Sequence, residues 1–585
     1  MKKLLVYLKD YKKESVLGPL FKLLEASFEL FVPLVIARIV DTGISGKDYG
    51  YVWRMGGVLL LLAMIGLVCS VTAQYFAAKA ATGFATSLRH SLFSHIQSLS
   101  FTEMDKLGTA AMITRMTSDI NQVQSGVNLV LRLFLRSPFI VFGAMIMAFT
   151  IDVKAALIFV VTIPVLSLIV FGIMMITMPL FKKVQKGLDR VLSKTRENLT
   201  GVRVIRAFAQ EQEEISEFGE ENTALTKLQM RVGRISALTN PLTYIVVNLS
   251  IAALIWVGAL RVDAGIITQG AVIALVNYMS QILVELVKLA NLIVTITKAL
   301  ACAGRIEKVF EIEPSMVYGD KAEYEKKKAE AGNTAPVYAV EFKNAGLTYR
   351  GAGAESLSGL NLKVKPGETI GIIGGTGSGK TSVVNLIPRY YDATEGEVLV
   401  DGINVKDYPM EALRDKVGMV MQKAVLFKGT IRQNLKWGRQ DATDEEMFEA
   451  LEIAQAKEFV DTKDGKLSAP ITQGGKNLSG GQKQRLTIAR ALVRKPEILV
   501  LDDSASALDY ATDAKLRKAL RGMREKLTVF IVSQRAASIM HADQIVVLDD
   551  GHVAGIGRHE ELLAGCEVYQ EIYYSQFKKE EGKGA

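Results

Sequence analysis

Four uninterrupted apolar runs constrain this chain of 585 residues more than any other feature of its sequence. Each is longer than 20 residues and contains no Asp, Glu, Lys or Arg: residues 55–78, 155–181, 235–260 and 264–284. A helix needs about 20 apolar residues to cross the hydrocarbon core of a bilayer. Four such runs in one chain argue against a soluble helical core and predict membrane-spanning helices.

Two weaker apolar runs bring the expected number of spanning helices to six. Ionisable side chains interrupt both: Lys22, Glu25, Glu29 and Arg38 in the first, and Arg132 and Arg136 near the start of the second. We therefore expect an all-α transmembrane domain over residues 1–312, with helical extensions between the spans. Its six helices are expected at about 15–42, 55–79, 130–151, 155–181, 235–260 and 264–297.

Ionisable residues within spans are candidates for function, because burying a charge in a bilayer costs free energy. Lys22, Glu25 and Glu29 share one helix face, and Glu285 and Lys288 are spaced to pair. We expect most of these residues to lie at headgroup depth or to bond between helices. Glu29 and Arg38 lie deeper and are the better candidates for a polar cavity.

The charge distribution predicts how the chain is oriented in the membrane. Residues 1–312 hold 32 basic and 22 acidic residues, a net charge of +10. With a cytoplasmic N-terminus, the loops expected outside carry only Lys47, Lys154 and Arg261, which fits the positive-inside rule. Because the basic residues alternate with apolar runs instead of sharing a polar face, nucleic acid is not an expected partner. We expect a multi-pass protein of the plasma membrane, in contact with lipid, with a cytoplasmic second half.

The second half of the chain has the pattern of a separate α/β domain. Residues 313–337 are charged and poor in large apolar side chains, and they end before short β-rich runs that alternate with helices. We expect a linker over 313–337, a nucleotide-binding domain over 338–578, and a polar tail over 579–585.

A phosphate-binding loop lies near the start of this domain. The strand predicted at 368–373 is followed by GGTGSGKT, which matches G-x-x-x-x-G-K-[ST] between a strand and a helix. The glycines let backbone N–H groups turn toward phosphate, Lys380 would reach the β- and γ-phosphates, and Thr381 would ligate Mg²⁺. The predicted nucleotide site comprises Gly374, Gly375, Thr376, Gly377, Ser378, Gly379, Lys380, Thr381 and Ser382.

Two further motifs support nucleotide chemistry. A second apolar strand, 498–501, ends in Asp502, and a carboxylate in that position beside a P-loop is expected to support Mg²⁺. Between the two lies LSGGQ, where a Ser-Gly-Gly turn opens a helix and so forms a second anion-binding N-terminus. This sequence, called the signature below, consists of Leu478, Ser479, Gly480, Gly481 and Gln482.

The order P-loop, LSGGQ, ILVLDD and SALD resembles the ATP-binding cassette of ABC transporters. Behind six membrane helices, it makes nearly the whole chain similar to a half-transporter of the ABC exporter type (type IV fold). The resemblance implies a multi-domain protein: an all-α six-helix transmembrane domain followed by an α/β P-loop cassette that binds ATP and Mg²⁺. SALD supplies the D-loop: Ser506, Ala507, Leu508 and Asp509.

The same resemblance assigns roles to other residues. Tyr349 falls where the family stacks an aromatic ring on adenine, although an ordinary strand aromatic is the alternative. Gln422 matches the Q-loop, which senses Mg²⁺ and the attacking water, and 472–475 matches the cross-talk loop. Residues 101–124 and 197–211 are similar to the intracellular loops whose tips, the coupling helices, contact the cassettes.

Two positions depart from the family pattern. Asp503 stands where the family has a glutamate that polarises the attacking water, and Gln534 stands where it has the switch histidine that contacts the γ-phosphate. The carboxylate of Asp503 should end about 1 Å short of that water, and misplacement on this scale can cost about 100-fold in rate. We expect this chain's own site to bind ATP and to hydrolyse it poorly.

The signature is intact, which implies an unequal pair. In the family two cassettes dimerise head to tail, and each ATP lies between one P-loop and the other chain's signature. We therefore expect the partner to be a non-identical half-transporter, with glutamate and histidine at the site that Ser479, Gly480 and Gly481 complete.

The favoured function is ATP-driven export by alternating access. The alternatives are a lipid or siderophore translocator, which could work as an importer, and an ATP-gated regulatory or channel subunit. A hydrophobic or amphiphilic small molecule would suit the polar and Met-rich residues of the spans, with ordinary packing as the competing explanation: Met145, Met147, Met174, Met175, Asn248, Trp256, Asn277 and Tyr278.

Overall fold

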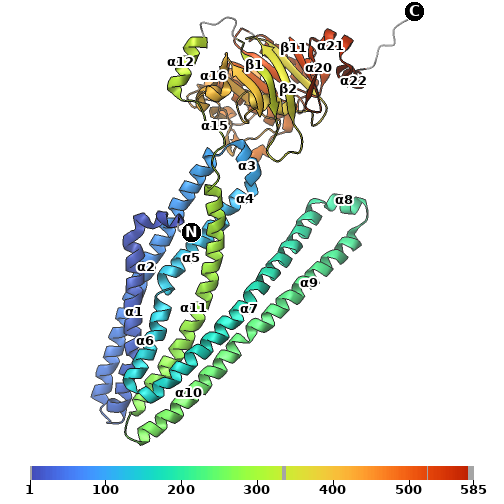
Figure 1. Cartoon of the computed structure of the whole chain (residues 1–585). Helices are drawn as coiled ribbons and strands as arrows, with labels where there is room; N and C mark the ends of the chain where they lie inside the picture. Colours follow the sequence, from blue (N-terminus) through green and yellow to red (C-terminus); the bar gives the residue numbers. More distant parts are fainter. Residues whose placement is uncertain (1–2, 332–337, 524, 578–585) are drawn as a thin grey trace, which may run out of the picture. The chain divides into compact units, whose positions relative to one another are not determined.

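A computed structural model describes residues 3–331, 338–523 and 525–577 of the chain. These residues divide into two compact units, which Figure 1 shows with their elements labelled. The first unit comprises residues 1–97 and 109–312, and the second comprises 98–108 and 313–585. The division falls after Ile312, and one short segment from the first half of the chain, residues 98–108, belongs with the second unit.

Helices make up the first unit. They are η1 (Leu4–Tyr11), α1 (Lys12–Arg38), η2 (Ile39–Ile44), α2 (Tyr49–Ser98), α4 (Thr109–Thr114), η3 (Arg115–Asp119), α5 (Ile120–Leu133), α6 (Arg136–Ile151), α7 (Val153–Thr200), α8 (Val202–Ala207), α9 (Glu211–Ala237), α10 (Thr239–Asp263) and α11 (Gln269–Phe310). The apolar faces of several of them meet in a common core around Phe159, Leu254 and Met279. The long helices run well past the apolar runs, so helical segments continue beyond the parts that are suited to span a membrane.

Five helical segments are long and apolar enough to cross a membrane: Tyr49–Ser98, Thr109–Ile151, Val153–Thr200, Glu211–Asp263 and Gln269–Phe310. The expected sixth span, 15–42, corresponds to α1 and η2, but among the described residues α1 does not meet the same composition criterion. Every stretch of α1 that is long enough to span contains at least three charged side chains, because Lys22, Glu25 and Glu29 lie close together at its centre. The span expected at 130–151 lies within the segment Thr109–Ile151, where α5 ends at Leu133 and α6 begins at Arg136, two residues before Pro138.

The charged residues within the spans form a cluster that bonds three helices together. Arg136 of α6 donates to Glu285 of α11 at 2.6 Å and to Glu29 of α1 at 2.7 Å. Ser137 and Lys288 each donate to Glu285 at 2.8 Å. The expected Glu285–Lys288 pair is thus confirmed, and Glu29 takes part in bonding between helices.

Replacing Arg136 with leucine is expected to lower the stability of the bundle by about 3 kcal/mol, because Glu285 is 3% exposed and would lose its buried partner. Thermal unfolding of the purified protein in lipid nanodiscs measures this effect. The matched control is Lys288→Met, since that side chain is 43% exposed and its loss leaves Glu285 paired with Arg136. Equal losses in the two variants would contradict the assignment of Arg136 as the central residue of the cluster.

A ten-stranded sheet forms the centre of the second unit, in the order β5-β4-β1-β2-β12-β11-β3-β10-β9-β6. Strands β11, β3, β10, β9 and β6 pair in parallel, whereas β1 pairs antiparallel with β2 and β4. The strands are β1 (Val340–Leu347), β2 (Leu357–Val364), β3 (Thr369–Gly374), β4 (Glu395–Val400), β5 (Ile403–Asn404), β6 (Val417–Val420), β9 (Ile498–Asp502), β10 (Thr528–Val532), β11 (Gln544–Asp549) and β12 (His552–Gly557), with β7 (Gly429–Thr430) and β8 (Pro470–Ile471) in a separate pair.

A separate apolar core lies on each side of this sheet, and helices make up much of the rest of the second unit. They are α3 (Phe101–Leu107), α12 (Lys321–Ala331), α13 (Lys380–Leu386), η4 (Val405–Asp407), α14 (Met410–Lys416), α15 (Ile431–Lys436), α16 (Asp444–Ile453), α17 (Lys457–Asp461), η5 (Lys466–Ser468), η6 (Gln473–Gly475), α18 (Gly480–Val493), α19 (Tyr510–Arg521), α20 (Ala536–Ile539), α21 (His559–Gly565) and α22 (Glu567–Gln576). The parallel strands of the sheet are nearly all apolar, as expected for strands buried on both faces.

The linker expected over 313–337 contains the helix α12. Its Tyr324 is 4% exposed and packs on the buried Tyr408, with 4.8 Å between the ring centroids. Lys327 forms an ion pair with Asp407 at 3.0 Å. Tyr324 therefore anchors α12, which is part of the charged stretch, against the sheet domain. Residues 332–337 and the expected tail at 579–585 lie outside the described residues.

Candidate functional site

The loop between β3 and α13 has the geometry of an anion cradle. Gly377 and Gly379 have φ angles of +86° and +89°, which side chains other than glycine rarely adopt. A Cβ at Gly379 would lie 2.3 Å from the carbonyl oxygen of Ser356, whereas nothing lies within 4 Å of one at Gly375 or Gly377. The loop is therefore closed on the protein side and open on the other, where backbone N–H groups and the α13 N-terminus can receive phosphate.

Lys380 places a buried ammonium group at this cradle. Its Nζ donates to the carbonyl oxygen of Gly374 at 2.9 Å and also to that of Gly375. Burial lowers the pKa of Lys380, and the carboxylates of Asp503 and Asp502 act in the opposite direction. A positive charge held among loop carbonyls fits a polyphosphate ligand.

Thr381 and Asp502 meet where Mg²⁺ was predicted. The hydroxyl of Thr381 lies 3.1 Å from both carboxylate oxygens of Asp502, which is 3% exposed. Burial raises the pKa of Asp502, and the hydrogen bond from Thr381 opposes that rise. A hydroxyl and a carboxylate are the hard oxygen donors that Mg²⁺ prefers, so these residues fit the ion. When bound there, Mg²⁺ would neutralise charge on the β- and γ-phosphates.

The two residues that depart from the family pattern follow neighbouring strands. Asp503 comes directly after β9, has a φ of +45°, and donates its backbone N–H to the carbonyl oxygen of Val532 at 3.0 Å. Its carboxylate accepts from the side-chain amide of Gln422 at 3.4 Å. Gln534 follows β10, and the Ser533 N–H donates to the carbonyl oxygen of Ile372 at 3.1 Å, beside the start of the P-loop. Both positions therefore lie at the carboxyl edge of the sheet with the P-loop.

Tyr349 is placed beside the P-loop helix. Its hydroxyl lies 3.1 Å from the Ser382 hydroxyl, and its ring meets that of Tyr391 edge-on with 4.9 Å between centroids. The Tyr391 hydroxyl donates to Asp105 of α3 at 2.6 Å. A cavity of about 450 Å³, lined among others by Tyr349, Tyr391 and Thr394, adjoins these rings. Tyr391 and Asp105 were not predicted, because no sequence motif marks a contact 286 residues apart.

The signature forms the start of α18. Ser479 is the N-cap residue, and its hydroxyl accepts from the Gln482 N–H at 3.3 Å while the Gln482 side chain accepts from the Ser479 N–H at 3.1 Å. This capping box confirms the predicted helix N-terminus. A Cβ at Gly481 would lie 3.0 Å from the carbonyl oxygen of Ala507, so the signature and D-loop are adjacent. The remaining members of the two motifs flank this contact: Leu478, Gly480, Ser506, Leu508 and Asp509.

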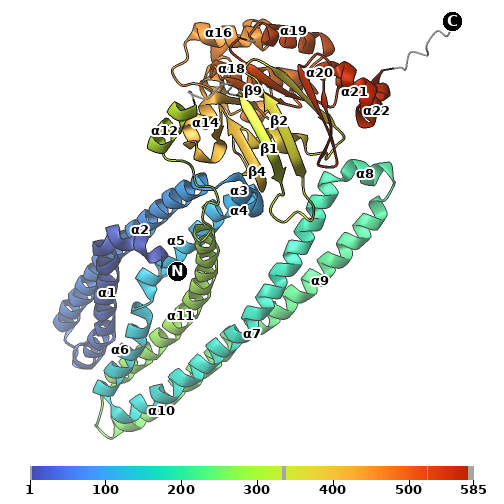
Figure 2. The same ribbon diagram turned by 45° about the horizontal axis from the view of Figure 1, so that its top comes forward.

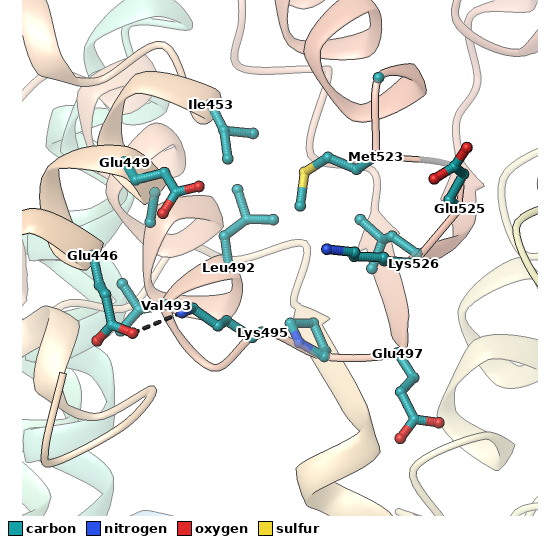
Figure 3. A pocket seen from close by; sticks show the side chains of 14 residues that line it. Glu446, Glu449, Ile453, Leu492, Val493, Lys495, Glu497, Met523, Glu525 and Lys526 are labelled. Carbon is teal, nitrogen blue, oxygen red and sulfur yellow. Dashed lines mark hydrogen bonds and ion pairs between the residues drawn. The ribbon is translucent and has the colours of Figure 1, made fainter.

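A larger cavity of about 550 Å³ lies elsewhere in the second unit (Figure 3). Its lining includes Leu492 and Met523, and Lys495 forms an ion pair with Glu446 at 2.7 Å on its rim. The cavity is lined by residues that precede β9 and β10, whereas the P-loop follows β3, which runs parallel to them. It is thus at the opposite edge of the sheet from the P-loop and takes no part in the nucleotide site.

Comparisons with known proteins agree with this geometry. Residues 15–286 match the family model described as the ABC transporter transmembrane region, and residues 357–506 match the model described as ABC transporter. An ABC transporter ATP-binding protein of Mycobacterium tuberculosis is 37% identical, with 97% of each chain covered. An ATP-dependent lipid A-core flippase of Desulfotalea psychrophila is 31% identical, with 93% of each covered.

A solved bacterial ABC exporter of the Atm1 family, with ATP bound, superposes with a TM-score of 0.79 at 22% identity. The match covers 97% of this chain and 99% of the other, so both chains share one fold over their whole length. One family assignment agrees with the transmembrane region, with the cassette and its P-loop, and with the relatives of similar length. The chain belongs to the ABC transporters, as a multi-pass half-transporter of the exporter type with its own ATPase domain.

Proposed function

We propose that this chain is the hydrolysis-poor half of a heterodimeric ATP-driven exporter. The observation that supports it is the pair Asp503 and Gln534, set at the edge of the sheet where the P-loop lies. Half-transporters of this family generally act as dimers, and a second chain with the glutamate and histidine would supply a competent site. The plasma membrane, with the cassette on the cytoplasmic side, is the location that the charge distribution supports.

Each part of the nucleotide has its own set of binding residues in this proposal. Lys380 and the loop amides bind the phosphates, Thr381 and Asp502 hold Mg²⁺, and Tyr349 orients adenine. Asp503 carries the carboxylate nearest to the attacking water, but it is one methylene shorter than glutamate and its backbone is fixed to Val532. Gln534 can donate a hydrogen bond, but it carries no charge toward the γ-phosphate. This site would therefore hold ATP through many turnovers of the other site.

Closure of the cassettes on ATP would switch the membrane helices between inward- and outward-facing states. The closed dimer must bind ATP more tightly than the separated one for this coupling to work. Two helices are the candidates for transmitting the closure: α3, whose Asp105 accepts a hydrogen bond from Tyr391, and α8 at the tip of the second loop. The relative named as a lipid A-core flippase supports an amphiphilic substrate.

Transport measurements test this function. Inside-out vesicles that contain this chain and its partner are expected to accumulate a fluorescent amphiphile against its gradient when ATP and Mg²⁺ are added, and not with a non-hydrolysable ATP analogue. Flux that only follows the concentration gradient, or conductance that ATP gates without accumulation, would favour a channel subunit. Accumulation in right-side-out vesicles instead would indicate an importer.

A further inference from the structure

The C-terminal helix α22 holds the loop that carries Gln534. The side-chain amide of Gln576 donates to the carbonyl oxygen of Gln534 at 2.7 Å. The carbonyl oxygen of the same amide accepts from the backbone N–H of Ala536 at 2.9 Å. One side chain thus bonds to the backbone on both sides of Arg535, and we call residues 533–535 the switch loop.

This contact satisfies a backbone group that has no partner within its own helix. Ala536 is the first residue of α20, and it is fully buried. The first N–H groups of a helix lack intrahelical acceptors, and here the N-cap residue Arg535 offers no side-chain bond. Gln576 therefore caps α20 from a helix 40 residues further along the chain.

The position of Gln576 is fixed by the packing of α22. Tyr569 of this helix is fully buried, and its hydroxyl lies 2.8 Å from the Nδ1 atom of His559. Tyr573 stacks on Phe577 with 4.6 Å between centroids, next to Gln576. The helix contacts α20, β11 and β3, and Figure 2 shows α20, α21 and α22 together at one end of the sheet. Gln576 is thus presented by an anchored helix, although its own side chain is exposed.

The other side of the switch loop contacts the D-loop. The guanidinium of Arg535 donates to the carbonyl oxygens of Leu508 and Ser506, both at 3.4 Å, and lies 5.0 Å from the ring centroid of Tyr510. The switch loop therefore lies between the D-loop and α22. The Ser533 N–H also bonds to Ile372, beside the P-loop. A substitution at Gln576 that moves the switch loop would therefore also shift its contacts with the D-loop and the P-loop.

We propose that Gln576 is a positioning residue for the nucleotide site: it fixes the backbone of Gln534 so that this side chain can meet the γ-phosphate. The proposal rests on the proposed function, since it takes the γ-phosphate contact of residue 534 from the ABC exporter family. It goes beyond that function by making the C-terminal helix a determinant of how this site distinguishes ATP from ADP. ADP lacks the γ-phosphate, so its binding should not depend on the two hydrogen bonds that Gln576 makes to the switch loop.

The test is the affinity of the full-length chain for ATP and for ADP, each with Mg²⁺, measured by calorimetry in lipid nanodiscs. Gln576→Leu removes both hydrogen bonds, and it is expected to weaken ATP binding about tenfold while ADP binding changes less than about twofold. Gln576→Glu keeps the acceptor for Ala536 but cannot donate to Gln534, and it is expected to weaken ATP selectively as well. Gln570→Leu is the matched control, because Gln570 lies on the same helix and bonds to Leu563.

The outcomes separate positioning from simple stabilisation. Equal weakening of ATP and ADP, or no change in either, would overturn the proposal, as would the same selective loss in Gln570→Leu. If Gln576→Leu does not fold, the ratio of ADP to ATP affinity in Gln576→Glu decides between these results. If the unmodified chain binds neither nucleotide, the proposed function itself fails, and the role of Gln576 fails with it.

Discussion

The double substitution Asp503→Glu with Gln534→His is expected to raise the ATPase rate at this chain's own site by about 100-fold. The added methylene lets the carboxylate reach the attacking water, and the histidine supplies a group that can carry a positive charge near the γ-phosphate. Release of phosphate by the lone chain in nanodiscs, at saturating ATP and Mg²⁺, measures the gain.

A matched double variant separates the effect of side-chain length at position 503 from the effect of its carboxylate. Asp503→Gln with Gln534→His restores the side-chain length at position 503 but not the carboxylate, and we expect no gain from it. If both double variants stay at the rate of the unmodified chain, position 503 does not limit hydrolysis. If both rise equally, a carboxylate at that position is not what the site lacks.

In the assembled pair, ATP hydrolysis is expected to depend on the signature of this chain much more than on its P-loop. Ser479→Asp in the signature is expected to reduce the ATPase rate of the pair by at least about 100-fold, because it would place a negative charge against the ATP at the competent site. Aspartate is a good N-cap residue, so α18 should still form. Lys380→Ala in this chain's own P-loop is expected to reduce the rate less than about tenfold, because that site contributes little turnover.

Both variants are assayed in the complex with its partner, after the assembly of each pair has been checked by size exclusion. If the two sites are unequal as proposed, Ser479→Asp must reduce the ATPase rate of the pair more than Lys380→Ala does. If Lys380→Ala were the more damaging change and Ser479→Asp were mild, the hydrolysing site would be the one with this chain's P-loop. The roles of the two sites would then be exchanged.

The sequence predicted the architecture well wherever a pattern is local. The P-loop, the signature and Asp502 are marked by residues close together in sequence, and the parallel sheet brings the carboxyl ends of β3, β9 and β10 together. The helix N-terminus expected at Ser479 forms with its capping box. These features depend on short-range backbone preferences, which the sequence carries directly.

Other features could not be predicted because they depend on contacts between distant residues. Nothing near Tyr391 indicates that it bonds to Asp105, and nothing near Gln576 indicates that it caps α20. Charge counting marked Glu285 and Glu29, but only the packing of the helices shows that Arg136 lies between them. Tyr324 likewise anchors α12 within a stretch whose composition suggested only a linker.

The most direct test of the unequal-pair account is the ATPase rate per cassette of the lone chain, compared with the rate of the chain paired with a half-transporter that carries the glutamate and histidine. Both are measured in nanodiscs at saturating ATP and Mg²⁺. The account predicts that the lone chain binds ATP but turns it over about 100-fold more slowly than the pair. A lone chain that hydrolyses ATP as fast as the pair would contradict it.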